Sequence, residues 1–170
     1  MQTTTVKLYS LRYDEVRTYL FAAAFVLGNI ALPQLCHLFR LGGPTWLPIY
    51  FFTLVGAYKY GWRTGLAAAL VSPLLNSVFF GMPAAAMLPA VLLKSTLLAL
   101  AAGTIAARTR RASLGMLAAV VVLYQTIGTL GEWALTGSLY AAAQDLRIGV
   151  PGMLLQIFGG WWVINRVIRE

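Results

Sequence analysis

Charged side chains are scarce in this sequence. Of its 170 residues, 11% are charged and 59% are hydrophobic. A soluble domain carries about 25% charged residues, because a surface that faces water needs them and a surface that faces lipid does not. The composition therefore excludes an ordinary soluble domain and indicates a chain that lies mostly in a membrane.

Cysteine and histidine occur once each, as Cys36 and His37. A single cysteine excludes a disulfide within the chain and a metal site built from several thiolates. Neighbouring residues on a helix point about 100° apart, so a Cys–His dyad is not expected. We interpret Cys36 as a small apolar core residue and His37 as a polar group at the membrane interface. A contact with a ligand at the outer end of the helix stays open for both.

Several functional motifs are absent as well. The sequence has no GxxxxGK[ST] segment, so the chain is not expected to hydrolyse ATP through a P-loop. It also lacks the HExxH and GxSxG patterns. We therefore expect no enzymatic activity, no cofactor and no metal. Residues 1–13 lack the pattern of a cleaved signal peptide, so the first transmembrane helix is expected to direct insertion.

The apolar residues form six runs, and glycine, proline or charged residues separate them. One crossing of a bilayer takes about 20 residues, so the chain has room for six helices with short connections and no further domain. Turns are predicted at 41–44 and 81–83, where glycine and proline interrupt the helical pattern. We predict an all-α polytopic membrane protein with one transmembrane domain, 1–170, and helices at 18–38, 46–59, 61–80, 84–106, 112–136 and 147–168.

Basic residues are distributed unevenly between the two sides of this predicted topology. With the N-terminus inside, the outer segments hold Arg40 and Arg147, and Lys94 lies within the membrane. Cytoplasmic segments of membrane proteins collect lysine and arginine, so both termini are predicted in the cytoplasm. The same rule explains the net charge of +8 without a nucleic-acid partner. The basic residues of the inner segments are Lys7, Arg12, Arg17, Lys59, Arg63, Arg108, Arg110, Arg111, Arg166 and Arg169.

Four short segments carry a family resemblance. They are WLPIY at 46–50, GAYKYGWRTG at 56–65, SPLLN at 72–76 and GMP at 81–83. Together with six short helices and two cytoplasmic termini, they resemble the substrate-binding S components of energy-coupling-factor (ECF) vitamin transporters. The resemblance covers nearly the whole chain. Its motifs are degenerate and leave the substrate open.

The resemblance implies a function and a set of partners. S components capture a vitamin or related micronutrient at the outer face of the bacterial cytoplasmic membrane. They then dock on a shared transmembrane coupling subunit that two ATPase subunits drive. Small residues spaced by four on the first helix typically form the docking face, and here Ala24 and Gly28 have that spacing. Such a strip lets another helix pack closely, and packing against a helix of the same chain is the alternative.

Lys94 is the most informative single residue. It lies about ten residues into the predicted fourth helix, hence about 15 Å below the outer boundary. An ammonium group near the bilayer centre costs about 3 kcal/mol, so such a residue faces a cavity or a partner. One interpretation is a counter-ion for a carboxylate or phosphate of the substrate. The other is a structural ion pair with Glu132, the only acidic residue inside a predicted helix. Both interpretations hold together if the substrate displaces this pair.

Further polar residues are predicted at a similar depth. Gln125, Gly128, Thr129 and Glu132 have helical spacing and share one face, as do Ser72, Asn76 and Phe80. Polar groups among apolar and aromatic walls are typical of a binding pocket, although the aromatic residues also fit an interfacial belt. The predicted substrate-binding residues are Lys94, Glu132, Asn76, Gln125, Gln34, Gln156, Trp46, Tyr50, Phe80 and Trp133.

These observations favour a subunit that captures a small water-soluble micronutrient, expected to be anionic or zwitterionic. Two other hypotheses remain at this point. The first is that the chain is a self-sufficient secondary transporter or channel. The second is that it is a membrane scaffold that binds no ligand. A scaffold requires only that Lys94 and Glu132 pair with each other.

Overall fold

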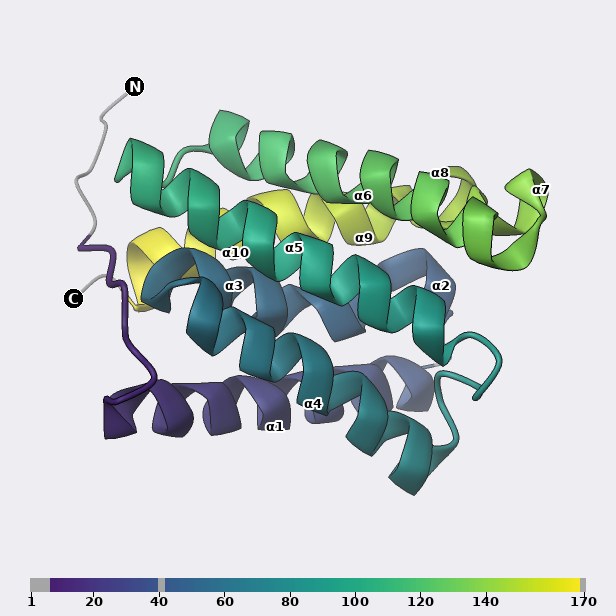
Figure 1. The fold of residues 1–170 in the computed structure, drawn as a ribbon, viewed down its shortest axis with the longest axis horizontal. Helices are drawn as coiled ribbons and strands as arrows, with labels where there is room; N and C mark the ends of the chain where they lie inside the picture. Colours follow the sequence, from purple (N-terminus) through teal and green to yellow (C-terminus); the bar gives the residue numbers. More distant parts are fainter. Residues whose placement is uncertain (1–6, 40–41, 169–170) are drawn as a thin grey trace.

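A computed structural model describes residues 7–39 and 42–168 of the chain. Every regular element in these ranges is helical, and the long helices lie side by side in a bundle (Figure 1). The predicted all-α class is therefore confirmed. The elements are α1 (Val16–Leu38), α2 (Gly43–Trp46), η1 (Pro48–Tyr50), α3 (Phe51–Tyr60), α4 (Trp62–Phe80), α5 (Leu88–Thr109), α6 (Leu114–Thr136), α7 (Leu139–Ala142), α8 (Gln144–Ile148), α9 (Val150–Leu154), η2 (Leu155–Gly159), α10 (Gly160–Trp162) and η3 (Val163–Val167).

Four of the described helices, α1, α4, α5 and α6, are long and apolar enough to cross a membrane. They have 19 to 23 residues each, which matches a hydrocarbon layer about 30 Å thick. Large apolar side chains cover their outer surfaces, including Leu20, Val78 and Val122. In water this surface would be unfavourable, whereas lipid solvates it, so the fold is that of a multi-pass membrane protein.

The helix predicted at 46–59 is divided. Leu47 has a left-handed backbone with φ of 46°, and this residue separates α2 from η1 and α3. The remaining helix, α3, is short because Gly61 follows it with φ of 101°, a conformation that favours glycine. The prediction of one continuous second helix was therefore wrong at its N-terminal end.

Two other predicted boundaries are shifted towards the C-terminus. The fourth helix was predicted from residue 84, and α5 begins at Leu88 with Pro89 in its first turn. The last helix was predicted from residue 147, and the helical run begins at Val150 with Pro151 in its first turn. Proline is favoured there because the first helical N–H groups have no partner within the helix. The connection 137–149 contains the short helices α7 and α8, which the sequence pattern did not predict.

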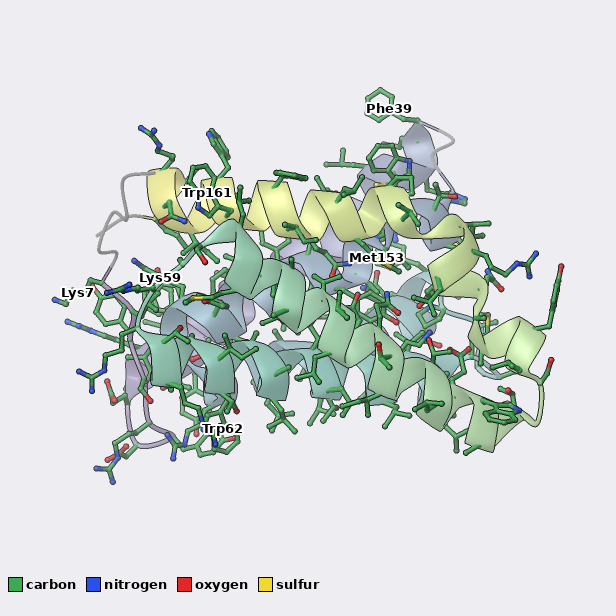
Figure 2. The ribbon with its side chains drawn as sticks, turned by 90° about the horizontal axis from the view of Figure 1, so that it is seen from above. Lys7, Phe39, Lys59, Trp62, Met153 and Trp161 are labelled. Carbon is green, nitrogen blue, oxygen red and sulfur yellow. The ribbon has the colours of Figure 1, made fainter. Side chains whose placement is uncertain are left out.

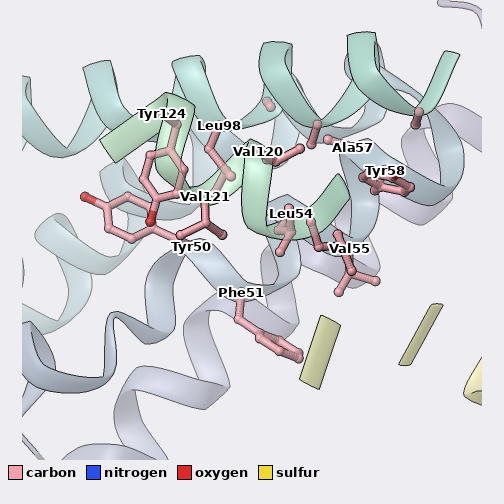
Figure 3. Close-up of a cluster of buried hydrophobic side chains, with 14 of the residues drawn as sticks. Tyr50, Phe51, Leu54, Val55, Ala57, Tyr58, Leu98, Val120, Val121 and Tyr124 are labelled. Carbon is pink, nitrogen blue, oxygen red and sulfur yellow. The ribbon is translucent and has the colours of Figure 1, made fainter. Parts of the chain in front are cut away.

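The short helix α3 forms the centre of the bundle. All of its residues except Phe52 are buried, and it packs against α1, α4 and α5. Figure 3 shows Leu54 and Val55 of α3 in one cluster with Leu98 of α5 and Val120 of α6. Each of these four side chains is completely buried. The long helices thus surround α3, and this arrangement positions η1, which precedes it, at one end of the core.

A buried asparagine connects three of these helices. The Nδ2 atom of Asn29 in α1 donates to Thr53 Oγ1 at 2.9 Å and to Ser72 Oγ at 3.2 Å. Its Oδ1 atom accepts from the backbone N–H of Phe52 at 3.1 Å. That N–H lies in the first turn of α3, where helices leave donors without an intrahelical partner. Asn29 therefore caps α3 through a tertiary contact and holds α1, α3 and α4 in register.

Basic residues gather at one end of the bundle. Figure 2 shows Lys7 and Lys59 at this end, and α1 and α4 both begin there. α5 and η3 end there. The opposite end is formed by α2, α7, α8 and the segment 81–87 (Figure 1). Of the described basic residues, those at the first end are Lys7, Arg12, Arg17, Lys59, Arg63, Arg108, Arg110, Arg111 and Arg166. Arg40 and Arg169, which entered the predicted charge count, lie outside the described residues.

Candidate functional site

A cavity of about 760 Å³ lies at the end of the bundle opposite the basic residues. The C-terminal part of α1, α2, η1, the segment 81–87 and α8 surround it. Most of its wall is apolar, and the side chains of His37, Tyr50, Gln144 and Asp145 supply polar groups. Binding sites for small organic molecules have about this volume and this combination of an apolar wall with a few polar groups.

Lys94 forms a buried ion-pair cluster with two carboxylates. Its Nζ atom is 2.5 Å from Glu132 Oε2 and 2.7 Å from Asp145 Oδ2. The side chains of Lys94, Glu132 and Asp145 are 3%, 10% and 15% exposed. An unpaired charge at this depth would be very unfavourable, and the three groups satisfy one another. The ion pair between Lys94 and Glu132, one of the two sequence interpretations, is therefore present.

Gly128 makes room for this cluster. A Cβ atom at position 128 would lie 2.7 Å from Cγ of Lys94, which is closer than non-bonded carbons approach. Gly128 and Glu132 are one turn apart on α6, so the same helix face accommodates the lysine chain and binds its ammonium group. All four residues of the predicted polar face on α6 are buried, as their spacing indicated: Gln125, Gly128, Thr129 and Glu132.

Asp145 was not among the predicted site residues. It belongs to α8, within the connection between the fifth and sixth predicted helices. Its position matters because Asp145 both pairs with Lys94 and lines the cavity. The available signal was the small number of acidic residues, five in the whole chain. A second acid next to the outer ends of the helices was a natural partner for a buried lysine.

A second polar cluster lies deeper in the bundle, beside the ring of Tyr50. The Tyr124 hydroxyl donates to Gln156 Oε1 at 2.9 Å and accepts from Gln125 Nε2 at 3.0 Å. The rings of Tyr50 and Tyr124 are 5.8 Å apart between centroids, and Figure 3 shows them at the edge of the apolar cluster. Gln125 Oε1 and Gln156 Nε2 are buried and have no hydrogen-bond partner in the part of the chain that the structure describes. The structure thus brings the predicted residues Gln125 and Gln156 together, outside the cavity wall.

The other predicted polar residues do not meet at the cavity. Asn76 is buried and donates to the backbone oxygens of Asn29 and Ser72, both at 3.0 Å, so it belongs to the contact between α1 and α4. Gln34 is half-buried and is not part of the cavity wall.

The predicted aromatic wall differs as well. Tyr50 alone of the four predicted aromatic residues lines the cavity. Trp46 is half-buried at the end of α2, while Phe80 and Trp133 are both 45% exposed on the outer surface. Phe80 also departs from the predicted common face of α4, on which Ser72 and Asn76 are buried. Aromatic residues at the end of a membrane helix face lipid headgroups as readily as a pocket, and spacing along the helix does not separate the two.

The two predicted docking residues differ in their surroundings. Ala24 is exposed on α1. Gly28 faces the interior, because a Cβ atom there would lie 2.7 Å from the ring of Phe52 in α3. This geometry favours packing within the chain for Gly28. The exposed strip of α1 instead continues from Ala24 through Leu27 to Ala31.

His37 and Cys36 occupy separate environments. His37 is exposed and lines the cavity, whereas Cys36 is buried. Comparisons of the chain with protein-family models, with curated proteins and with solved structures found no match. The geometry of the cavity and of the Lys94 cluster therefore carries the functional argument.

Proposed function

We propose that this chain is the substrate-capturing subunit of an importer in the bacterial cytoplasmic membrane, similar to an ECF S component, and that it binds a vitamin or related micronutrient. The observation that carries the proposal is the apolar cavity of about 760 Å³ at one end of a membrane-embedded bundle. A cavity of this kind stabilises a small molecule by removing its apolar surface from water.

The end that holds the cavity is proposed to face outwards. Nine of the eleven described lysine and arginine residues gather at the other end, and basic residues remain on the cytoplasmic side during insertion. With both termini inside, the long helices supply four crossings. We assign the other two to η1 with α3 and to the helical run 150–167. A substrate then reaches the cavity from outside without crossing the apolar core around α3.

Energy for release into the cell is proposed to come from partners, since the sequence has no ATP-binding P-loop. The resemblance implies a transmembrane coupling subunit and two ATPase subunits. On α1, Leu20, Ala24, Leu27 and Ala31 form an exposed apolar strip with two small residues, on which a partner helix can pack closely.

The scaffold hypothesis and the capture hypothesis both accommodate the Lys94 cluster. They differ in what they predict for the cavity, because a scaffold gains no stability from an empty space that leaves apolar side chains without contacts. The apolar wall of the cavity, including Ile49 and Val91, therefore favours capture.

Native mass spectrometry of protein extracted gently from its membrane tests the proposal. We expect a small molecule to remain bound to the wild-type chain and to the variant Ala86→Trp. Ala84 lines the cavity and Ala86 does not, so Ala84→Trp should release the molecule. A chain without any bound molecule, or equal occupancy in the two variants, would refute capture in this cavity.

Uptake measurements test the proposed partners. Ala24→Trp should block close approach of a partner helix and lower uptake, while the bound small molecule is retained. Ala119→Trp places the same side chain on the exposed face of α6 and serves as the control. Full uptake by the chain in a host without coupling and ATPase subunits would favour the secondary-transporter hypothesis instead.

A further inference from the structure

We propose that the ligand of the cavity is an organic cation, namely an amine with an apolar body, whose charged nitrogen binds beside Asp145. This inference rests on the proposed function and names the substrate class of the same site. It departs from the expectation of an anionic or zwitterionic substrate, which took Lys94 as the counter-ion of a substrate carboxylate or phosphate.

The charges of the buried cluster do not balance. Lys94 contributes one positive charge, while Glu132 and Asp145 contribute one negative charge each, at 2.5 and 2.7 Å from the same Nζ atom. One negative charge therefore remains at the wall of a cavity with apolar surroundings. Low-dielectric walls concentrate the field of such a charge, so the cavity attracts a cation and repels an anion.

Within residues 7–39 and 42–168, no other charged side chain forms an ion pair with Glu132 or Asp145. The guanidinium of Arg147 stacks on the exposed ring of Tyr140 at 3.9 Å and donates to its hydroxyl. His37 lines the cavity from the exposed end of α1.

Tyr50 provides an independent indication of a ligand. This residue is only 3% exposed, and it lines the cavity together with Asp145. Its hydroxyl forms no hydrogen bond with the described residues. The hydroxyl oxygen is not one of the fully buried unpaired atoms of the described residues, so it keeps an accessible surface, and an N–H donor from a ligand in the cavity would satisfy it. The ring of Tyr50 also offers a face to a cation.

The rest of the cavity fits the apolar body of such a molecule. Leu47, Ile49, Met87 and Val91 contribute to its wall. Methionine adapts to irregular shapes, which suits a site that encloses an organic ring or chain. The expected ligand therefore has one charged end next to Asp145 and an apolar remainder.

Three probes with the same indole body separate charge from shape: tryptamine is cationic, tryptophol is neutral and indole-3-propionate is anionic. Their dissociation constants are measured by calorimetry at neutral pH with full-length protein in lipid nanodiscs. We expect tryptamine to bind the wild-type protein tightest. In Asp145→Asn, Lys94 keeps Glu132 as its partner, and the remaining charges balance. Tryptamine should then bind about ten- to a hundredfold more weakly, while indole-3-propionate should bind no more weakly than before.

Asp14→Asn is the matched control, since Asp14 lies at the other end of the bundle and is exposed beside Arg12. It should leave all three constants unchanged. Tighter binding of the anion, an equal loss for all probes in Asp145→Asn, or no binding of any probe would overturn the charge assignment. Native mass spectrometry distinguishes this failure from failure of the proposed function: a retained anionic molecule overturns only the charge, and the absence of any retained molecule overturns capture itself.

Discussion

Replacing Lys94 by methionine tests whether charge balance governs the cluster. Methionine has a similar length and no charge, so Lys94→Met leaves the carboxylates of Glu132 and Asp145 buried without their cation. Removing one partner of a buried ion pair costs about 3–5 kcal/mol. For a chain of this size, each kcal/mol shifts the thermal midpoint by about 2–4 °C. We therefore expect the midpoint to fall by about 6–20 °C.

The two acidic partners should respond differently from Lys94. Glu132→Gln leaves one lysine and one carboxylate, which balance, so its cost should be about 1 kcal/mol, the worth of a weakened hydrogen bond. The triple change Lys94→Met, Glu132→Gln and Asp145→Asn removes every charge and should recover most of the stability that Lys94→Met loses.

The assay is thermal unfolding in detergent micelles, followed by circular dichroism. Lys7→Met is the matched control, because Lys7 is exposed and its change should shift the midpoint little. The reasoning is refuted if Lys94→Met is as stable as the wild type, or if Glu132→Gln is as damaging as Lys94→Met.

Three further predictions concern packing and topology. Gly128→Ala should lower the free energy of unfolding by about 1–3 kcal/mol, because the added methyl group meets the Lys94 side chain. Gly115→Ala, on the open face of α6, should be neutral or stabilising. Thermal unfolding of the two variants compares these effects. Asn29→Ala should lower the free energy of unfolding by about 2–4 kcal/mol, because it leaves hydrogen-bonding groups of α3 and α4 without their partner. A loss below about 1 kcal/mol in urea-dependent unfolding would contradict this role of the Asn29 side chain. Arg110→Cys, without the native cysteine, should react with a membrane-impermeant maleimide only after cells are opened, and labelling of intact cells would invert the proposed orientation.

The sequence by itself determined that the chain is a helical membrane protein. Long apolar runs without charge are stable only in lipid, where the backbone must form its hydrogen bonds within helices. The same energetics predicted that Lys94 faces a cavity or a partner, because a buried ammonium group requires one. Helical spacing placed Glu132 on one face of its helix, and the structure shows that this face is buried. Gln125 and Thr129 share that face for the same reason.

Only the tertiary structure decided where the polar groups meet. Spacing along one helix predicts which residues share a face, but not which neighbouring helix that face contacts. Asn76 donates to the backbone oxygen of Asn29, and Gly28 lies against the ring of Phe52. Asp145 lies 51 residues from Lys94 in the sequence, and only the fold of α8 over the end of the bundle brings its carboxylate to the ammonium group and to the cavity. Contacts between segments so far apart depend on how all the helices pack together, and this packing also determines the excess negative charge at the cavity wall.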